Sequence, residues 1–314
     1  MYRELFSDFY NRNLPCDMEQ CLELFSIFGG LDIDIDTDKH IIELLLEHIF
    51  HNFDNLRATL LEPLDYDEKM IKLLTAISRG DRRSHSAFKR SRIGATRGDN
   101  YLRYLIAHHY IHKEYSKETP PLRTHPKQKF KKEIERHKIS HKYRFHSPFV
   151  RFWFAFIEPF APSIARRDFT SSLQFISQHL NSFIGFTFEE LSDIYINDIF
   201  ATELGSEIYE SGSYWDKDVE IDLFCTTRDG EIYIGECKWT NHKVNKKELH
   251  KLLDKADILN IKPQKIVLFS KRGFSNELLK EKDERVHLIS SKELERLIYT
   301  QLTSISKSLI RLLD

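Results

Sequence analysis

The stretch that decides the fold is Val219-Glu220-Ile221-Asp222-Leu223-Phe224, followed after a short turn by Ile232-Tyr233-Ile234-Gly235-Glu236-Cys237-Lys238-Trp239. Both runs alternate in polarity and are rich in β-branched and aromatic residues, which predicts the two strands of a β-hairpin. Between them, Arg228-Asp229-Gly230 suits a three-residue turn, because Gly230 adopts a left-handed conformation at little steric cost.

Three chemistry-bearing side chains of this hairpin are expected on one face of a sheet. Side chains alternate along a strand, so Glu236 and Lys238 point the same way, and a turn centred near Asp229 places Asp222 opposite Glu236. Two carboxylates beside a lysine suit a divalent cation next to a phosphodiester, because Mg²⁺ prefers oxygen ligands and keeps positions for water and phosphate. The alternative is a solvated surface ion pair.

The surrounding sequence predicts an α/β domain. A helix is expected at 171–200, with a break near Gly185, and a first strand at 207–214. After the hairpin, the pattern predicts a helix at 245–260, a strand at 265–270, a short helix at 275–282, a strand at 286–289 and a terminal helix from Ser291. This order is typical of a mixed sheet with helices on both faces.

Asp222, the tripeptide Glu236-Cys237-Lys238 and this element order resemble the PD-(D/E)xK nuclease superfamily, which has the restriction-endonuclease-like fold. Residues 185–191, 212–216 and 220–239 also resemble the C-terminal winged-helix and nuclease-like region of prokaryotic DEXX-box-type ATPases that carry a domain of unknown function. The resemblance covers about residues 70–290.

The resemblance implies a role for each matching residue. Asp222 and Glu236 would bind Mg²⁺ or Mn²⁺ together with the backbone carbonyl of Cys237, and Lys238 would be the catalytic lysine. Glu189, on the preceding helix, would be the acid that assists the metal site.

Charge is distributed very unevenly along the 314 residues. Residues 1–78 hold 6 Lys/Arg against 16 Asp/Glu, a net of −10, whereas residues 79–151 hold 20 against 6, a net of +14. A basic segment of this kind favours a polyanionic partner, most simply nucleic acid, since phosphates give sequence-independent affinity. The alternative is that the basic segment packs against the acidic N-terminal region of the same chain.

The basic segment has the pattern of a winged helix. Helices are predicted at 70–79, at 84–92 and from Thr96, and the strands of a wing at 110–115 and 142–145. The DNA-contact residues expected on the third helix are Arg97, Asn100, Arg103 and Tyr104. Between the wing strands, the basic insertion at about 116–141 adds Lys127, Lys129, Lys131 and Lys132. By contrast, the aromatic run at 149–160 is expected to form core.

The expected organisation is therefore multidomain, α and α/β: an acidic helical region at 1–68, a winged-helix domain at 69–160 and a nuclease-like domain at 161–314. The chain has no Gly-x-x-x-x-Gly-Lys-Ser/Thr loop, which excludes a nucleotide site of that kind and departs from the ATPases. No signal peptide and no 18-residue apolar run is visible, so a cytoplasmic protein without membrane spans is expected.

Two functional hypotheses follow. The first is a Mg²⁺- or Mn²⁺-dependent endonuclease that acts on duplex or branched DNA. The second is a DNA-binding regulator or partner-binding module whose nuclease-like fold is inactive. A homodimer and a separate ATPase are the protein partners left open.

Overall fold

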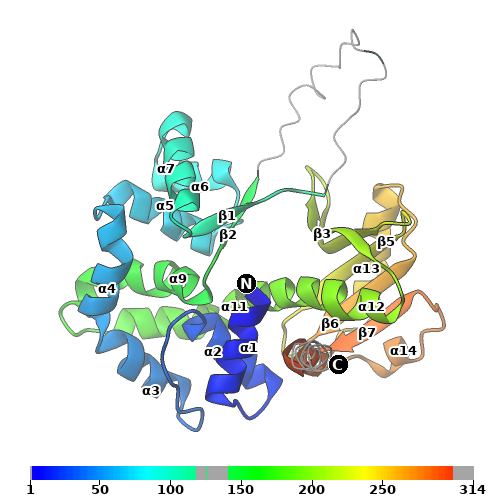
Figure 1. Cartoon of the computed structure of the whole chain (residues 1–314), viewed down its shortest axis with the longest axis horizontal. Helices are drawn as coiled ribbons and strands as arrows, with labels where there is room; N and C mark the ends of the chain where they lie inside the picture. Colours follow the sequence, from blue (N-terminus) through cyan, green and yellow to red (C-terminus); the bar gives the residue numbers. More distant parts are fainter. Residues whose placement is uncertain (1, 118–124, 126–140, 300–314) are drawn as a thin grey trace, which may run out of the picture.

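The computed structural model describes residues 2–117, 125 and 141–299. Within these residues, a helical part built around the N-terminal half of the chain lies beside a C-terminal part built around a five-stranded mixed sheet (Figure 1). The long helix α11, Thr170–Tyr195, runs through both. The predicted combination of a helical N-terminal region with a C-terminal mixed sheet is therefore confirmed.

The acidic N-terminal region is helical, with the elements α1 (Tyr2–Asn13), α2 (Met18–Phe28), α3 (Ile41–Leu45), η1 (Leu46–Phe50), α4 (Phe53–Leu61) and η2 (Glu62–Leu64). Asp17 caps α2 by accepting a hydrogen bond from the backbone N–H of Gln20. Most of α2 is buried, including Phe25 and Phe28, because it packs against both the central helix and the aromatic segment near 150. This region is thus part of the main core.

The basic segment forms three helices followed by a two-stranded ribbon, which we call the helix–ribbon unit. Its elements are α5 (Glu68–Arg79), α6 (Ser84–Ser91), α7 (Ala95–Ala107), β1 (Ile111–Glu114) and β2 (Lys142–Phe145). The ribbon is antiparallel, with Ile111 opposite Phe145. Helix α7 begins at Ala95 with Gly94 as its N-cap, one residue before the predicted start at Thr96.

The aromatic run after β2 is core, as predicted. It forms α9 (Pro148–Phe152), η3 (Trp153–Ile157), η4 (Glu158–Phe160) and α10 (Ala161–Ile164). Trp153 is fully buried and stacks on Phe53, with 5.6 Å between ring centroids. The indole N–H of Trp153 and the guanidinium of Arg57 both donate to Glu158, so this buried carboxylate is satisfied.

Helix α11 continues through Gly185, so the predicted break is wrong. It extends without interruption into η5 (Ile196–Phe200) and α12 (Ala201–Glu203). One glycine weakens a helix interior by only about 1 kcal/mol relative to alanine. Packing on two sides of the helix outweighs that cost, since Phe183 contacts Phe152 and Phe188 contacts Trp239.

The sheet has the order β3-β4-β5-β6-β7, with β3 (Ile208–Trp215), β4 (Glu220–Thr227), β5 (Ile232–Lys238), β6 (Lys265–Ser270) and β7 (Val286–Ser290). The first three strands are antiparallel, and β6 and β7 run parallel to β5. Helices α13 (Lys246–Ile258) and α14 (Asn276–Leu279) follow β5 and β6, and η6 (Ser291–Glu295) follows β7.

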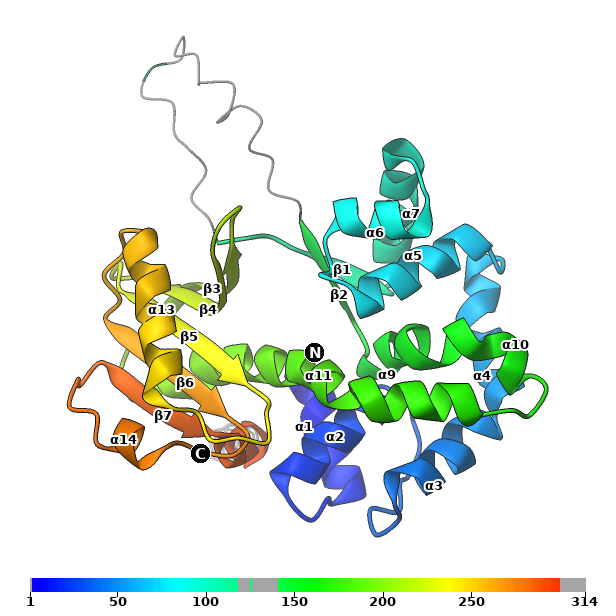
Figure 2. The ribbon, with the colours of Figure 1, turned by 180° about the vertical axis from the view of Figure 1, so that it is seen from behind.

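The two faces of the sheet belong to two cores. Leu223 and Phe269 join the large core shared with α11, whereas Ile234 and Leu268 form a second core with Leu252 of α13. Figures 1 and 2 show α13 and α11 on opposite faces of the sheet. The predicted hairpin is confirmed, including the turn, where Gly230 has a φ of 83°.

Two glycine substitutions are expected to change stability in opposite directions. In Gly185→Ala the new methyl group lies 3.8 Å from the nearest heavy atom, so the helix gains about 0.5–1 kcal/mol in free energy of unfolding. In Gly235→Ala the methyl group lies 2.9 Å from the carbonyl oxygen of Val267, and the overpacking costs about 1–3 kcal/mol. Denaturant unfolding of both variants tests this; a loss in Gly185→Ala contradicts the continuous helix.

Candidate active site

The β4–β5 hairpin brings the two predicted acids together. Leu223 of β4 lies opposite Gly235 of β5, Asp222 and Glu236 adjoin this pair on their two strands, and the charge of Glu236 acts on Asp222. The backbone N–H of Cys237 donates to Oδ2 of Asp222 at 2.9 Å, which fixes this carboxylate against the neighbouring strand. The sulfur of Cys237 is buried on the other face of the sheet, in the core shared with α11.

Glu236 lies between two lysines. Nζ of Lys238 is 2.5 Å from Oε1 of Glu236, and Nζ of Lys255 on α13 is 2.7 Å from Oε2. Lys238 also lies 3.7 Å from Glu248, another α13 residue. Sequence reasoning missed Lys255 and Glu248, although their spacing of seven residues places both on one face of the predicted helix.

The acids form an electrostatically strained group. Burial raises the pKa of Asp222 well above its usual range, and repulsion from Glu189 and Glu236 raises it further, although the Cys237 N–H and Lys238 oppose the change. Glu189 on α11 therefore lies close enough for its charge to act on Asp222. Burial also raises the pKa of Glu189, against the attraction of Arg82 and other cations of the helix–ribbon unit.

The chemistry of these donors fits a hard divalent cation. Asp222 and Glu236 offer carboxylate oxygens, and the backbone carbonyl of Cys237 lies on the strand between Glu236 and Lys238. A cation at this position would relieve the repulsion around Asp222. Among residues 2–117, 125 and 141–299, no group of three or more His, Cys, Asp or Glu side chains is arranged to bind a metal.

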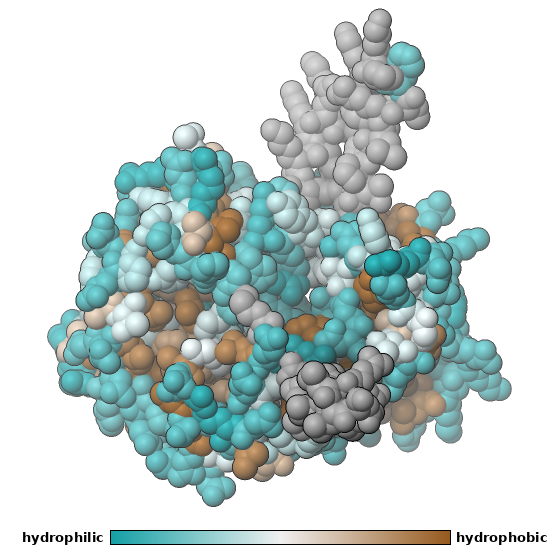
Figure 3. Space-filling model, in the orientation of Figure 1, coloured by the Kyte–Doolittle hydropathy of each residue, from teal (hydrophilic) through white to brown (hydrophobic). Residues whose placement is uncertain are grey.

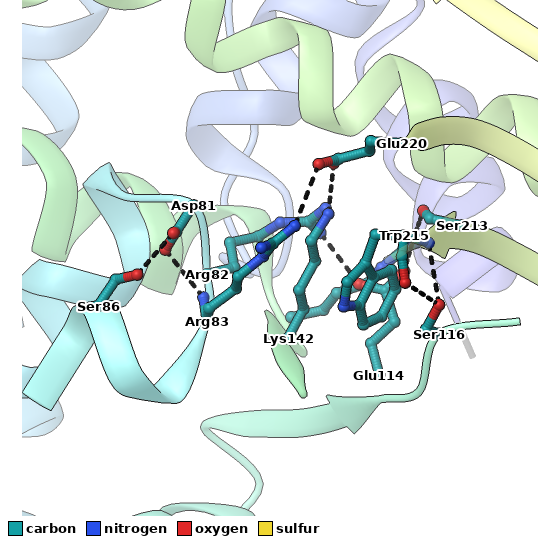
Figure 4. A network of polar contacts seen from close by, with 11 residues as sticks. Asp81, Arg82, Arg83, Ser86, Glu114, Ser116, Lys142, Ser213, Trp215 and Glu220 are labelled. Atoms are coloured by element: carbon teal, nitrogen blue, oxygen red, sulfur yellow. Dashed lines mark hydrogen bonds and ion pairs between the residues drawn. The ribbon is translucent and has the colours of Figure 1, made fainter. Parts of the chain in front are cut away.

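A network of charges joins the helix–ribbon unit to the sheet (Figure 4). Lys142 of β2 forms an ion pair with Glu220 of β4, and Arg83 lies 3.5 Å from the same carboxylate. The Lys142 side chain is only 3% exposed, whereas that of Glu220 is 51% exposed. Burial lowers the pKa of Lys142 despite its partner, so this contact is held at an energetic cost.

The second half of the network is centred on Glu114. Arg144 and Arg82 lie 2.5 Å and 3.4 Å from its oxygens. Burial alone would raise the pKa of Glu114, but the two arginines outweigh it and hold that pKa at about 2. Arg144 also lies 3.7 Å from Glu190 of α11.

The chain that leaves β1 is attached to the edge of the sheet. Oγ of Ser116 donates to the carbonyl of Trp215 and accepts from its backbone N–H, at 2.5 Å and 2.9 Å (Figure 4). The backbone N–H of Lys117 donates to Ser213, also on β3. These bonds cover part of an edge strand that would otherwise present free backbone groups.

The residues predicted to contact DNA on α7 are exposed. Arg97, Asn100, Arg103 and Tyr104 all lie on the surface of this helix, away from the buried Leu102. Hydrogen bonds hold all four: Nε of Arg97 donates to the Tyr101 hydroxyl, Nη2 of Arg103 donates to Asn100, and the Tyr104 hydroxyl donates to the carbonyl of Pro63. The other four predicted residues, Lys127, Lys129, Lys131 and Lys132, lie outside the described residues.

The alternative, that the basic segment packs against the acidic N-terminal region, is observed only in part. Tyr101 of α7 donates to Asp67, and the charge of Arg97 acts on the same carboxylate. The buried Arg82 and Arg144 pair instead with Glu114 and Glu190, as described above. In the N-terminal region, Glu19 binds Lys271 and Arg272, at 2.8 Å and 3.0 Å.

The surface in Figure 3 is mainly hydrophilic, with apolar residues in scattered groups. No helix within the described ranges is both long enough and apolar enough to span a membrane.

Comparison with known proteins places part of the chain in context. Residues 153–252, about a third of the chain, match the DUF234 family, described as archaeal and bacterial proteins of unknown function. The match contains α11, β3, β4, β5 and just over half of α13, and hence Glu189, Asp222, Glu236 and Lys238. No curated protein and no solved structure matches the chain.

Asp222→Asn is expected to stabilise the protein at pH 7 by about 0.5–2 kcal/mol, the usual size of a stabilising substitution. Folding raises the pKa of the Asp222 carboxyl. The folded protein therefore loses stability as the pH rises above the ordinary aspartate pKa, near 3.9, and through the pKa of the folded state. The advantage of asparagine should therefore fade towards pH 4. Denaturant unfolding between pH 4 and 8 measures it.

The matched control is Asp254→Asn on the exposed side of α13, which should show no such pH dependence. If Asp222→Asn is no more stable than the wild type at pH 7, Asp222 is not held at an electrostatic cost.

Proposed function

We propose that this protein is a Mg²⁺- or Mn²⁺-dependent endonuclease of the PD-(D/E)xK type that acts on DNA. The observation that carries the proposal is the juxtaposition on one hairpin of Asp222, Glu236 and Lys238, with Glu189 acting on Asp222 from the neighbouring helix. The strand order and the mixture of antiparallel and parallel strands fit the restriction-endonuclease-like fold.

Each residue has a distinct role in this proposal. Asp222, Glu236 and the carbonyl of Cys237 would hold the metal, which when bound lowers the pKa of a coordinated water and stabilises charge on phosphate oxygens. Lys238 would orient the attacking water beside the phosphodiester. Glu189 would support Asp222, and Arg82, Arg144 and Arg151 attract its charge, although burial still raises its pKa.

The helix–ribbon unit supports the DNA-binding part of the proposal. Three helices followed by an antiparallel ribbon is the element order of a winged helix, in which the third helix enters the major groove. On α7, that third helix, Arg97 and Arg103 are exposed. Further exposed cations, Lys89, Arg90 and Arg92, lie on or just after α6.

A second function is favoured by one observation. Both oxygens of Glu236 are occupied by lysines, which compete with a metal for this carboxylate. This arrangement suits a DNA-binding regulator or partner-binding module in which Glu236 and its two lysines only stabilise the sheet. The cleavage experiment separates the two functions.

Cleavage of plasmid, linear, single-stranded and branched DNA, and of RNA, with Mg²⁺ or Mn²⁺ is the first test. Wild type should cut DNA only with metal, and Asp222→Ala and Lys238→Ala should each lower the rate at least about 100-fold, since both remove groups that act on the reacting atoms. The matched controls are Asp254→Ala and Lys262→Ala, both exposed residues. Salt-sensitive DNA binding without cleavage by the wild type would favour the regulator.

DNA affinity should depend on α7. Arg103→Ala is expected to weaken duplex binding and to reduce the slope of log K against log salt by about 1, as expected for one lost phosphate contact. Fluorescence anisotropy between 50 and about 200 mM salt measures both. Lys280→Ala, at an exposed position after α14, is the control of equal charge change. Equal slopes for the two variants would exclude α7 as the DNA-contact surface.

A further inference from the structure

A pocket of about 250 Å³ lies where α5, η3 and the N-terminal half of α11 meet. Figure 2 shows α5 and α9 beside this half of α11, away from the sheet. Two arginines and four aromatic rings line much of it: Arg79, Arg151, Phe156, Phe175, Phe183 and Phe186. The wall is thus mostly aromatic, with two separate positive charges.

Within the described residues, neither guanidinium has a carboxylate at ion-pair distance. Nε of Arg79 donates to the carbonyl of Ala155 at 2.5 Å, and its guanidinium carbon lies 4.2 Å from the Phe175 ring centroid. Nη2 of Arg151 donates to the carbonyl of Phe183 at 3.2 Å, with the guanidinium carbon 3.9 Å from that ring. A guanidinium has five N–H donors, so each arginine retains donors for a ligand.

Arg151 and Arg144 provide a comparison within one molecule. Both side chains lie in protein surroundings, but Arg144 pairs with Glu114, and the pKa of Arg144 is raised because that attraction outweighs burial. For Arg151 burial dominates over the more distant Glu190 and lowers its pKa to about 10. An arginine held in this way is electrostatically uncompensated, and an anion in the pocket would stabilise it.

The residues that line the pocket also indicate which chemical group of an anionic ligand would carry the negative charge. Two guanidiniums from different elements suit a phosphate, which accepts several charge-assisted hydrogen bonds at once. Phenylalanine rings and guanidinium planes are the surfaces on which nucleobases stack. We propose that this pocket binds one nucleotide unit, either as a free nucleoside monophosphate or as the 5′-phosphorylated end of a strand. Because the pocket uses neither Asp222 nor Glu236, this proposal goes beyond the proposed nuclease activity.

Isothermal titration of the full chain with AMP, adenosine and inorganic phosphate tests the chemistry. Asp222→Ala protein in EDTA is used in parallel, so that the result does not depend on catalysis. AMP should bind at least about tenfold more tightly than adenosine or phosphate alone. Arg79→Met should weaken AMP binding about 10- to 100-fold, the usual effect of a lost charge-assisted hydrogen bond. Arg79 is exposed, so this variant is expected to fold.

A second variant fills the pocket without removing charge. Ser182 lines the pocket on the exposed side of α11, so Ser182→Phe should also abolish binding. Ser177→Phe, at an exposed position on the same helix and not part of the pocket lining, should bind like the wild type.

A 5′-phosphorylated single-stranded oligonucleotide and its unphosphorylated twin distinguish the two sources of the ligand. Binding of AMP alone supports a free nucleotide, and tighter binding of the phosphorylated strand that is lost in Ser182→Phe supports a strand end. The proposal is overturned if neither ligand binds, or if Arg79→Met and Ser182→Phe bind as well as Ser177→Phe. Cleavage by the wild type is a separate readout, and its failure leaves these outcomes interpretable.

Discussion

Helix α11 is the constraint on which the rest of the structure depends, because its 26 residues must pack on two sides at once. On one side Phe183 contacts Phe152 and Phe156 of the aromatic segment. On the other side Phe188 contacts Trp239 and Phe269 of the sheet. Because both apolar sides of α11 are fixed by packing, the directions in which Glu189 and Glu190 leave the helix are also fixed. They are directed to the junction between the sheet and the helix–ribbon unit.

That junction concentrates charge where water is scarce, which is expensive unless every charge is paired. The structure pairs most of them: Arg144 and Arg82 with Glu114, and Lys142 with Glu220. The exceptions are informative. Among the described residues, Asp222 remains close to other acids and Arg151 has no carboxylate at ion-pair distance, so these two groups carry opposite charges that are incompletely compensated. Groups kept at such a cost are the ones most often used for binding or chemistry.

The strands were the most predictable part of this protein. Alternation around Asp222 and Glu236 defines a hairpin by itself, and the turn at Gly230 fixes the register, so the approach of the two acids follows from local rules. The prediction of a helix break at Gly185 is wrong because local propensity favours a break, whereas tertiary packing on both sides of α11 keeps the helix continuous. Likewise, α7 begins at Ala95 because Gly94 serves as N-cap, and Thr96 is not needed for it.

Pairing between distant side chains could not be predicted. A count of charges treats Arg82, Lys142 and Arg144 as available to DNA, although the structure buries Arg82 and Lys142 and pairs all three with acids from other elements. Lys255 is similar, since its contact with Glu236 depends on how α13 crosses the sheet. Neither contact has a signature within a short window of sequence.

The shared core also constrains how this chain is made. Phe6 and Phe25 belong to the same cluster as Leu294 and Leu297, and Nε of Arg3 donates to the carbonyl of Leu297. During translation, the first helices therefore leave the ribosome long before the residues that cover them have been synthesised. At about 5–20 residues per second, they wait at least several seconds with apolar surface uncovered. During this interval the uncovered apolar surface makes the nascent chain prone to aggregation.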